Sequence, residues 1–426
     1  MKSWRQIKLK DICERITVGH VGSMSNEYID EGIPFLRSQN INPYRINRNG
    51  LKFVSKQFHE SLRKSALRFG DVAVVRTGYP GTACVIPKDL GEANCSDLVI
   101  ITPGLELNAY FLSAVFNSRF GKDLVGGNLV GAAQQHFNVT TAKELKIFLP
   151  PKTAQDKIAA VLSAYDDLIE TNKKRIEVLE KMAKELYREW FVRMRFPGYK
   201  NTKFVKGVPE GWEIRKINSI VEFQSGHAFK SINYVLDGKF GIVTISNVHD
   251  GEFIPACSDS VDSKPSNIKD HCILRQGDIL MSLTGNVGRV CKVFGENLLL
   301  NQRVAKLNAI GGANNSYIYC FFRQQHVQDF CEMVATGAAQ QNLSPIKFGN
   351  QTALIPSCEL LDKFETLSKP LIEMSTVLRE TNETIMFSRD LLLPRLISGK
   401  LSVEDLDIQF PPSMREEEVE PELAHA

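Results

Sequence analysis

Two short polar loops recur at matched places in this chain of 426 residues. The first, Arg76-Thr77-Gly78-Tyr79, follows a β-branched run, and the second, Leu283-Thr284-Gly285-Asn286, follows a similar run 207 positions later. A tight turn that needs glycine is enough to explain the shared Thr-Gly pair. The turn does not explain why Arg76 and Tyr79 of the first loop become Leu283 and Asn286 in the second. These replacements change the hydrogen-bonding groups, although the turn itself stays the same. Both loops are therefore candidate contacts to a polar ligand.

Side-chain amides recur in the same way. The sequence GAAQQ at Gly131–Gln135 is repeated at Gly337–Gln341. Amides in such loops can cap nearby backbone groups, or they can pair with a polar polymer, as they do with the edge of adenine. The residues alone favour neither interpretation. The polar loops Arg37–Asn40 and Ser246–His249 are likewise open to both interpretations.

The candidate binding residues are the polar members of these loops and their immediate neighbours. Amide, hydroxyl, imidazole and guanidinium groups of this kind hydrogen-bond to base edges and phosphates. The candidates for contact with such a polymer are Arg37, Ser38, Asn40, Arg76, Thr77, Tyr79, Gln134, Gln135 and His136 in the first half of the chain, and Ser246, Asn247, His249, Thr284, Asn286, Gln340, Gln341 and Asn342 in the second.

Signatures of known catalytic centres are absent from the sequence. We find no P-loop, no G-x-G-x-x-G after a strand, no H-E-x-x-H, no G-x-S-x-G and no Asn/Asp-Pro-Pro-aromatic motif of amino-methylating enzymes. The eight histidines are dispersed, and no two of the nine cysteines have the close spacing of zinc ligands. We therefore predict no catalytic residue, no metal ion and no cofactor.

The charge balance identifies no partner by itself. Lys and Arg number 52 against 49 Asp and Glu, a net charge of +3. The segment Ser413–Ala426 holds five Glu and one Arg, so the rest of the chain carries about +7. The sequence shows no signal peptide and no apolar run long enough to span a membrane, and its scattered cysteines indicate a reducing compartment. We expect a cytoplasmic protein without membrane association.

The two sets of loops belong to a tandem duplication. Leu67–Cys84 (LRFGDVAVVRTGYPGTAC) aligns without a gap on Leu274–Cys291 (LRQGDILMSLTGNVGRVC) at an offset of 207. The two GAAQQ segments have an offset of 206, and Glu170-Thr171-Asn172 recurs as Glu380-Thr381-Asn382 at an offset of 210. An ordered series at a nearly constant offset predicts a repeated unit of about 206 residues.

Each repeated unit divides into a globular part and a long helix. The globular part mixes β-branched runs, bounded by Gly and Asp, with short helical segments, which predicts a mixed α/β domain. The helical part repeats apolar residues in alternating steps of four and three, which predicts a supercoiled seam interrupted by Asn172 in the first helix and by Thr381 and Ser388 in the second. The predicted seams are Ile158, Leu162, Tyr165, Ile169, Asn172, Ile176, Leu179, Ala183, Leu186 and Trp190, and Phe364, Leu367, Leu371, Met374, Leu378, Thr381, Ile385, Ser388 and Leu392.

Several segments carry a resemblance to a known family. They are the duplicated G-D-hydrophobic-T-G segments, WFVRMRFPG at Trp190–Gly198, VPEGW at Val208–Trp212 and LLLPRLISGK at Leu391–Lys400. Together with the long helices, they resemble the specificity (S) subunit of type I restriction-modification enzymes over essentially the whole chain. The resemblance implies an α+β fold with two duplicated mixed α/β target-recognition domains, each reading one half of a split DNA sequence. Two long antiparallel coiled-coil helices would join them with pseudo-two-fold symmetry.

Proline and glycine residues place the predicted boundaries of these parts. We expect target-recognition domain 1 at 1–150, a central long helix at 151–195, a linker at 196–211, target-recognition domain 2 at 212–357, a C-terminal long helix at 358–398 and an acidic C-terminal tail at 399–426. We expect the Glu-rich part of the tail, after Pro411, to be disordered.

The resemblance implies a non-catalytic subunit rather than an enzyme. Its partners would be double-stranded DNA, two methylation (M) subunits that dock on the helices, and restriction (R) subunits, so that the partners methylate adenine and cut DNA. The alternatives are a specificity subunit of a methylation-only complex, a methyltransferase in its own right, and a coiled-coil scaffold without DNA specificity. Binding of the methyl donor by the isolated chain would identify a methyltransferase, and a gel-shift competition would identify a scaffold.

Overall fold

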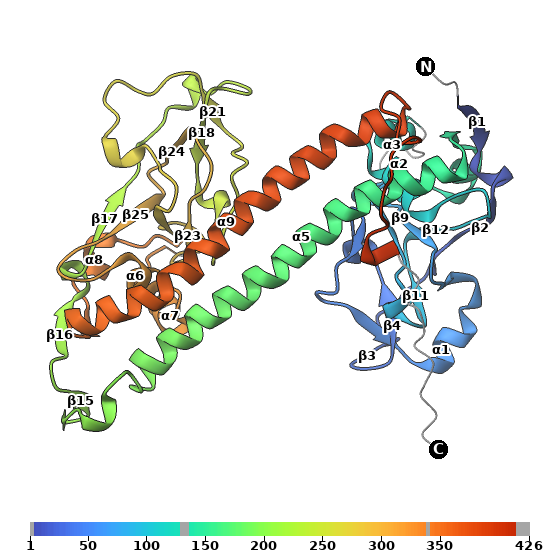
Figure 1. Cartoon of the computed structure of the whole chain (residues 1–426). Helices are drawn as coiled ribbons and strands as arrows, with labels where there is room; N and C mark the ends of the chain where they lie inside the picture. Colours follow the sequence, from blue (N-terminus) through green and yellow to red (C-terminus); the bar gives the residue numbers. More distant parts are fainter. Residues whose placement is uncertain (1–3, 128–135, 338–340, 415–426) are drawn as a thin grey trace. The chain divides into compact units, whose positions relative to one another are not determined.

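The chain forms two compact units in the computed structural model, which describes residues 4–127, 136–337 and 341–414. Unit 1 comprises Met1–Glu170 and Thr384–Ala426, and unit 2 comprises Thr171–Glu383. Each unit holds one mixed α/β domain and part of each of two long helices, α5 (Lys152–Tyr187) and α9 (Cys358–Ile397) (Figure 1). The predicted α+β fold with a duplicated domain and two long helices is confirmed.

Unit 1 is built around a four-stranded antiparallel sheet with the strand order β10-β9-β12-β2 and a five-stranded sheet with the order β3-β7-β4-β11-β8. Its strands are β1 (Arg5–Lys8), β2 (Cys13–Val18), β3 (Tyr28–Ile29), β4 (Ile33–Leu36), β5 (Ile41–Asn42), β6 (Arg45–Ile46), β7 (Lys52–Val54), β8 (Ala66–Leu67), β9 (Val72–Val75), β10 (Ala83–Val85), β11 (Ala93–Cys95), β12 (Leu98–Pro103) and β13 (Lys146–Leu149). Its shorter helices are α1 (Lys56–Ser61), α2 (Ala109–Asn117), α3 (Arg119–Gly126) and α4 (Val139–Glu144).

Unit 2 repeats the main features of this arrangement with the sheets β17-β25-β22-β23 and β21-β18-β24. The strands that follow α5 are β14 (Phe204–Val205), β15 (Val208–Pro209), β16 (Glu213–Lys216), β17 (Val221–Ser225), β18 (Phe240–Val243), β19 (Val248–His249), β20 (Glu252–Phe253), β21 (Ser260–Val261), β22 (Ile279–Ser282), β23 (Val290–Lys292), β24 (Leu298–Leu300), β25 (Val304–Ala309) and β26 (Thr352–Ile355). The shorter helices are α6 (Asn315–Phe322), α7 (Gln325–Val334) and α8 (Pro345–Gly349). One parallel strand pair occurs at the same place in each unit, β4 with β11 and β18 with β24.

The repeated Gly-Asp pair anchors the central strand of each four-stranded sheet. The glycines, Gly70 and Gly277, have φ angles of 82° and 85°, where a side chain would be strained. The carboxylate of Asp71 accepts a hydrogen bond from the main-chain nitrogen of Arg68 at 2.8 Å and from the guanidinium of Arg15 on β2 at 2.6 Å. In unit 2, the carboxylate of Asp278 accepts a hydrogen bond from the main-chain nitrogen of Arg275 at 2.8 Å. The ammonium group of Lys306 on β25 lies 2.8 Å from the same carboxylate. The pair is therefore a structural element, and the loop that follows each strand starts from a fixed point.

The strand that precedes each Thr-Gly loop is buried on both faces. In unit 1, Val72 and Val74 pack in the cluster that contains Phe111 of α2, whereas Ala73 and Val75 pack in a second cluster with Leu36. A strand with two covered faces has a continuous apolar sequence instead of an alternating one. The strand thus holds the following loop, Arg76-Thr77-Gly78-Tyr79, at the rim of a rigid sheet.

Most of the first predicted helical seam is buried, whereas Tyr165, Leu179 and Leu186 are only partly buried. Along α5, the seam positions Ile158, Leu162, Ile169, Ile176 and Ala183 are all buried. The helix continues through a π-helical turn at Arg188–Val192, and Trp190 in this turn is also buried. The heptad of α5 therefore marks its inner face.

Only part of the second predicted seam is correct. Phe364 is fully buried, whereas Leu367 and Met374, which we placed inside the helix pair, are 51% and 52% exposed. In unit 2 the residues of α9 that contact α5 include Ser375 and Asn382. Because these two inward residues are small or polar, the hydrophobic pattern of α9 does not reveal them.

A buried asparagine pair joins the long helices in unit 2. The Nδ2 group of Asn172 donates a hydrogen bond of 2.9 Å to Oδ1 of Asn382, and both side chains are buried. These are the equivalent asparagines of the repeated Glu-Thr-Asn tripeptide. Because Glu180 of α5 meets Ser375 of α9, the two helices run antiparallel here. A polar pair at an inner heptad position fixes the register of two helices, since a shift would leave both amides buried without partners.

Each globular domain begins with a tryptophan that packs on a chain segment that follows a long helix. Trp212 of the VPEGW motif packs against Phe196, with ring centroids 5.5 Å apart. Trp4 lies against Gly399, where an added Cβ would be 3.0 Å from the indole ring. The motif residues that carried the family resemblance therefore have a packing role.

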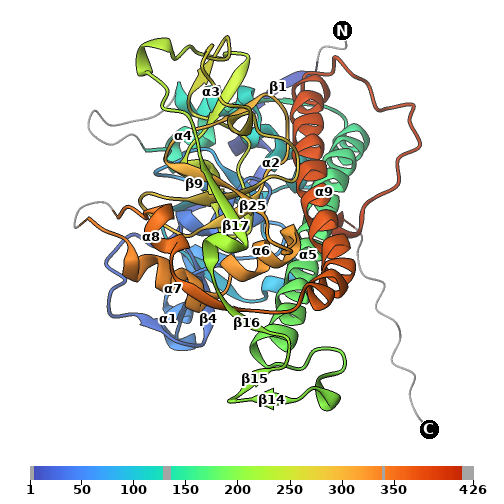
Figure 2. The ribbon, with the colours of Figure 1, turned by 90° about the vertical axis from the view of Figure 1, so that its left-hand side faces the viewer.

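The segment after α9 is a chain without a long helix or strand (Figure 2), and hydrogen bonds attach it to other residues of unit 1. Lys157 of α5 donates to the main-chain oxygen of Glu404 at 2.6 Å. The hydroxyl of Tyr110 donates to the main-chain oxygen of Ser413 at 2.8 Å. The expected disorder of the tail is therefore wrong for Pro412–Met414, which form a short 3-10 turn. The tail residues beyond this turn lie outside the described part of the chain.

The asparagine pair gives a first prediction. Asn382→Leu removes the acceptor of the buried Asn172 amide and should lower the free energy of unfolding by about 1–3 kcal/mol in urea denaturation. The double change Asn172→Leu/Asn382→Leu should recover most of this loss, because neither amide then needs a partner. Thr381→Ala, at an exposed neighbouring position, is the control and should have little effect. An additive loss in the double variant would contradict the pairing.

Candidate nucleic-acid interface

Two of the predicted loops of unit 1 meet at one carboxylate. Ser38 donates to the main-chain oxygen of Asp97 at 3.3 Å and to its carboxylate at 3.4 Å, and the hydroxyl of Thr77 also donates to that carboxylate. The guanidinium of Arg76 lies 4.0 Å from the same group. Asp97 has a left-handed φ of 56°, so its side chain sits in a tight turn directly before β12. It therefore fixes two candidate loops relative to each other.

Sequence reasoning missed Asp97, although the duplication contains a signal for it. The strand β12 begins at Leu98 and its counterpart β25 begins at Val304, so Arg303 stands in unit 2 where Asp97 stands in unit 1. A reversal of charge at matched positions beside matched loops is the pattern expected of residues that adapt each copy to a different ligand surface. The interaction of Asp97 with two loops could be seen only in three dimensions.

The described part of the amide loop joins the same surface. The main-chain nitrogen of Phe137 donates to the main-chain oxygen of Arg76 at 3.2 Å, which places His136 beside the Thr-Gly loop. Among the described residues, four buried side-chain nitrogen or oxygen atoms have no hydrogen-bond partner. Three of them are Nε of Arg37, Nε of Arg76 and Nδ1 of His136. Buried polar atoms are normally paired, so these three unpaired atoms set this part of unit 1 apart from the rest of its described residues.

Tyr79 projects from this surface. Its side chain is 84% exposed, and the turn that carries it is closed by a hydrogen bond of 3.2 Å from its main-chain nitrogen to the oxygen of Thr77. Gly78 has a φ of 84°, which the turn requires. An aromatic ring on a rigid turn can stack or hydrogen-bond without a large loss of conformational entropy.

Unit 2 brings the equivalent loops together with other side chains. The hydroxyl of Thr284 donates to Oδ1 of Asn342 at 3.0 Å, and the main-chain nitrogen of Gly285 donates to the oxygen of Gln341 at 2.9 Å. The nitrogen of Leu343 donates to the oxygen of Leu283 at 2.8 Å and so repeats the Phe137–Arg76 contact of unit 1. The backbone arrangement is conserved between the copies, and the side chains on it differ.

The remaining candidate loop of unit 2 carries a hydroxyl and an imidazole. Ser246 Oγ lies 2.8 Å from the hydroxyl of Thr244, and Nε2 of His249 lies 3.1 Å from the main-chain oxygen of Ser246. Arg289, which sequence reasoning missed, lies 3.5 Å from Nδ1 of His249. Asn286 is exposed at the tip of the Thr-Gly loop. Imidazole, guanidinium and amide groups thus surround one end of the sheet in unit 2.

Two candidates are structural residues. Asn40 is buried, accepts from the main-chain nitrogen of Arg37 at 3.1 Å and donates to the oxygen of Asn47 at 3.0 Å. Asn247 makes the equivalent contacts, to the nitrogen of Thr244 at 2.8 Å and to the oxygen of Ile254 at 2.8 Å. Both amides are occupied within their own hairpins, so Asn40 and Asn247 are no longer candidates for contact with DNA. The sequence could not separate this capping role from binding.

Three other candidates, Gln134, Gln135 and Gln340, lie outside the described residues. In residues 4–127, 136–337 and 341–414, no group of three or more His, Cys, Asp or Glu side chains is arranged to hold a metal ion. No helix in these ranges is both long and apolar enough to cross a membrane.

The comparison with known proteins identifies the family. The family model for the type I restriction modification DNA specificity domain matches residues 1–181 and 209–360, which lie in the two repeats. The chain belongs to this family. It is a type I restriction-modification specificity subunit with two DNA-recognition domains, and the match covers most of both repeats.

Individual relatives of this specificity subunit agree with the family model. The MjaIX specificity subunit of Methanocaldococcus jannaschii is 28% identical over 431 aligned residues, which cover 95% of each chain. The HindI specificity subunit of Haemophilus influenzae is 20% identical, with 61% of this chain and 70% of the relative covered. The crystal structure of a type I S subunit from M. genitalium has the same fold, with a TM-score of 0.57 and 16% identity, and covers 92% of this chain and 96% of its own.

The contrast between Asn247 and Asn286 gives a second prediction. Asn247→Ala leaves buried backbone groups without their partner and should lower the free energy of unfolding by about 1–3 kcal/mol. Asn286→Ala changes an exposed side chain and should lower it by less than about 0.5 kcal/mol. Chemical denaturation of both variants checks the separation. Equal losses would show that the two amides do not divide into structural and binding roles.

Proposed function

We propose that this specificity subunit recognises a two-part sequence in double-stranded DNA and selects the adenines that partner methylation subunits modify. The recognition domains at 1–150 and 212–357 would each contact one half of the sequence. The observation that carries the proposal is the pair of matched loop clusters, which share their backbone arrangement and differ in the side chains at their surface. The subunit itself would supply recognition but no chemistry, and it would act in the cytoplasm.

The chemistry of the unit 1 cluster suits the major groove of DNA. The guanidinium of an arginine can pair with the O6 and N7 atoms of guanine, and a tyrosine or histidine can contact a neighbouring base or phosphate. Asp97 would hold Arg76 and Thr77 in position while contacting DNA little itself. In unit 2, Arg303 has the opposite charge, and the amides of Gln341 and Asn342 suit adenine. The two halves of the DNA sequence would therefore differ.

Docking of the methylation subunits is supported by the outward face of the long helices. In unit 2 an open groove of about 560 Å³ is lined by Thr171, Lys174, Arg175, Val178 and Leu179 of α5 and by Met374 and Leu378 of α9. The apolar heptad of α9 lies along this groove instead of against α5. A heptad that the chain leaves exposed fits a further amphipathic helix. We propose that a helix of a methylation subunit binds here, and that the duplication provides for two such subunits per chain.

Restriction subunits would join the same assembly. They would start from the sites that this subunit selects and cut the DNA. A methylation-only complex would use the same recognition surfaces and the same groove. Purified S and M subunits, with and without an R subunit, would distinguish these assemblies by whether unmodified DNA is cut.

The recognition surface gives a third prediction. In a complex with its methylation subunits, Arg76→Ala should relax the base preference at one position in one half of the recognition sequence, where a good bidentate contact contributes about 1–3 kcal/mol of discrimination. Asp97→Asn should affect the same half, because Arg76 and Thr77 would lose their anchor. Sequencing of methylated adenines in a random DNA library measures both effects. An equal loss in both halves would contradict the assignment.

The groove gives a fourth prediction. Met374→Glu or Val178→Glu places a charge in the apolar groove and should weaken association with the methylation subunits by at least about tenfold, because burial of that charge is unfavourable. Leu236→Glu is the matched control, since Leu236 is 97% exposed and lies in a loop of unit 2. Calorimetry of S and M association checks the result. Unchanged affinity in both groove variants would place the docking surface elsewhere.

A further inference from the structure

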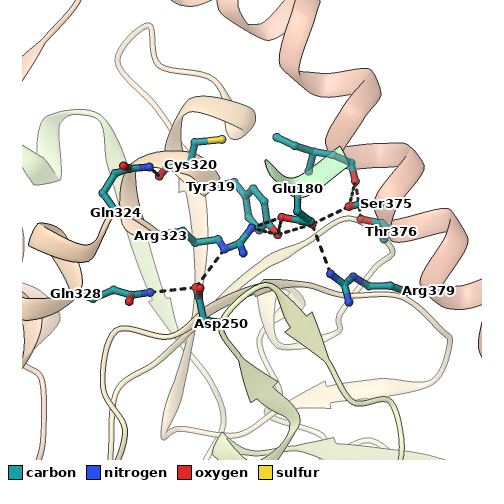
Figure 3. Close-up of polar contacts among 11 residues, drawn as sticks. Glu180, Asp250, Tyr319, Cys320, Arg323, Gln324, Gln328, Ser375, Thr376 and Arg379 are labelled. Atoms are coloured by element: carbon teal, nitrogen blue, oxygen red, sulfur yellow. Dashed lines mark hydrogen bonds and ion pairs between the residues drawn. The ribbon is translucent and has the colours of Figure 1, made fainter. Parts of the chain in front are cut away.

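The hairpin β19–β20 of unit 2 connects a candidate recognition loop to the long helices. Ser246 lies in the turn just before this hairpin, His249 ends its first strand, and its tip is Asp250-Gly251. Behind the tip, Arg323, the residue directly after α6, lies between the hairpin and Glu180 of α5 (Figure 3). A single side chain therefore contacts both the hairpin and a long helix.

The contacts of Arg323 use most of its guanidinium. Its Nε donates to the carboxylate of Asp250 at 3.1 Å, and its Nη1 donates to Glu180 and, at 2.7 Å, to the hydroxyl of Tyr319. The guanidinium also stacks on the Tyr319 ring, with its carbon 4.7 Å from the ring centroid. Gln328 donates to the same oxygen of Asp250 at 3.0 Å. A planar group with several fixed donors holds its partners in one geometry, which a lysine could not do.

The helix side of this network is fully engaged. Glu180 accepts from the hydroxyl of Ser375 at 2.8 Å and lies 3.7 Å from the guanidinium of Arg379. Burial opposes ionisation of Glu180, but Arg323, Ser375 and Arg379 together hold its pKa below the usual range. The carboxylate therefore stays charged between two arginines, and both long helices contribute to its site.

The hairpin tip is shaped to receive Arg323. Gly251 has a φ of 73°, and an added Cβ would lie 2.2 Å from Nη2 of Arg323. The main-chain nitrogen of Gly251 donates to the oxygen of Val290 at 2.7 Å, which ties the tip to β23. Asp250 directly follows His249 in the chain. The hydrogen bonds that fix the position of Asp250 therefore also restrict the position of the His249 imidazole, which contacts Ser246.

Unit 1 makes the same connection with different residues. Tyr44 occupies the tip of the hairpin β5–β6, and its nitrogen donates to the oxygen of Ala83, as Gly251 does to Val290. Arg389 of α9 stacks on the Tyr44 ring at 4.7 Å and lies 2.6 Å from Asp166 of α5. Arg45 of the same hairpin pairs with a further carboxylate of α5. In each unit an arginine on a tyrosine ring links a recognition hairpin to α5.

A purely stabilising contact would not need this chemistry. A buried ion pair contributes little more to stability than well-packed apolar side chains of the same volume, because its groups must lose their water. Its directional bonds instead fix one relative position of the groups that it joins. The two copies differ in the source of both the arginine and the tyrosine, yet each keeps an arginine stacked on a tyrosine ring and paired with a carboxylate of α5.

We propose that Arg323 is a positioning residue for DNA recognition by unit 2, and that it sets the place of the hairpin that carries Ser246 and His249 relative to α5. This inference rests on the proposed function. Arg323 touches no DNA. It acts through Asp250, and Arg389 is its counterpart for the hairpin of unit 1.

The test uses complexes of full-length S variants with their methylation subunits. Arg323→Met keeps the length and packing of the side chain and removes its directed bonds, and Asp250→Asn weakens the hold on the hairpin while leaving the Arg323–Glu180 pair intact. Arg389→Met is the matched control in unit 1. Methylated adenines are sequenced from a random DNA library, and thermal unfolding of each variant is measured in parallel.

We expect Arg323→Met and Asp250→Asn to reduce base discrimination by about tenfold in the half of the sequence read by unit 2, a loss of the size of one base contact. The other half should be unchanged, and Arg389→Met should show the reverse pattern. A lower unfolding temperature with unaltered base preference in both variants would overturn the inference and leave Arg323 a structural residue. An absence of sequence preference in the wild-type complex would instead refute the proposed function.

Discussion

The polar contacts between α9 and α5 in unit 2 are the constraint on which the other features depend. Asn382 pairs with Asn172, and Ser375 donates to Glu180, at inward heptad positions where large apolar residues are usual. These contacts have two consequences. The apolar side chains of Leu367 and Met374 remain on the outside of α9. The carboxylate of Glu180 is held in place, and its partner Arg323 belongs to the recognition domain of unit 2.

The two recognition domains combine a constant framework with variable contacts. The Gly-Asp turn, the buried central strand and the Thr-Gly loop recur in both copies, and so does the hydrogen bond from the amide loop to the residue before Thr-Gly. The groups at the loop surface differ, with Asp97 replaced by Arg303 and Tyr79 by Asn286. The two copies thus combine a shared local framework with different surface groups.

Much of this organisation could be predicted from the sequence, because duplication, turn glycines and long heptads are local patterns. The seam of α9 could be predicted only in part, since Leu367 and Met374 face outward and the inward residues Ser375 and Asn382 are small or polar. The roles of Asn40 and Asn247 were also hidden, because a capping amide and a binding amide look alike in a sequence. Asp97 and Arg323 act through residues far from them in the chain, so only the folded structure shows their contacts.

The most direct test of the central claim is a map of methylated adenines made by this subunit together with its methylation subunits on a random DNA library. The account predicts one two-part sequence with a fixed gap. It also predicts that a chain whose 212–357 domain comes from another family member changes one half of that sequence and retains the other. Methylation without sequence preference, or a domain exchange that alters both halves, would contradict it.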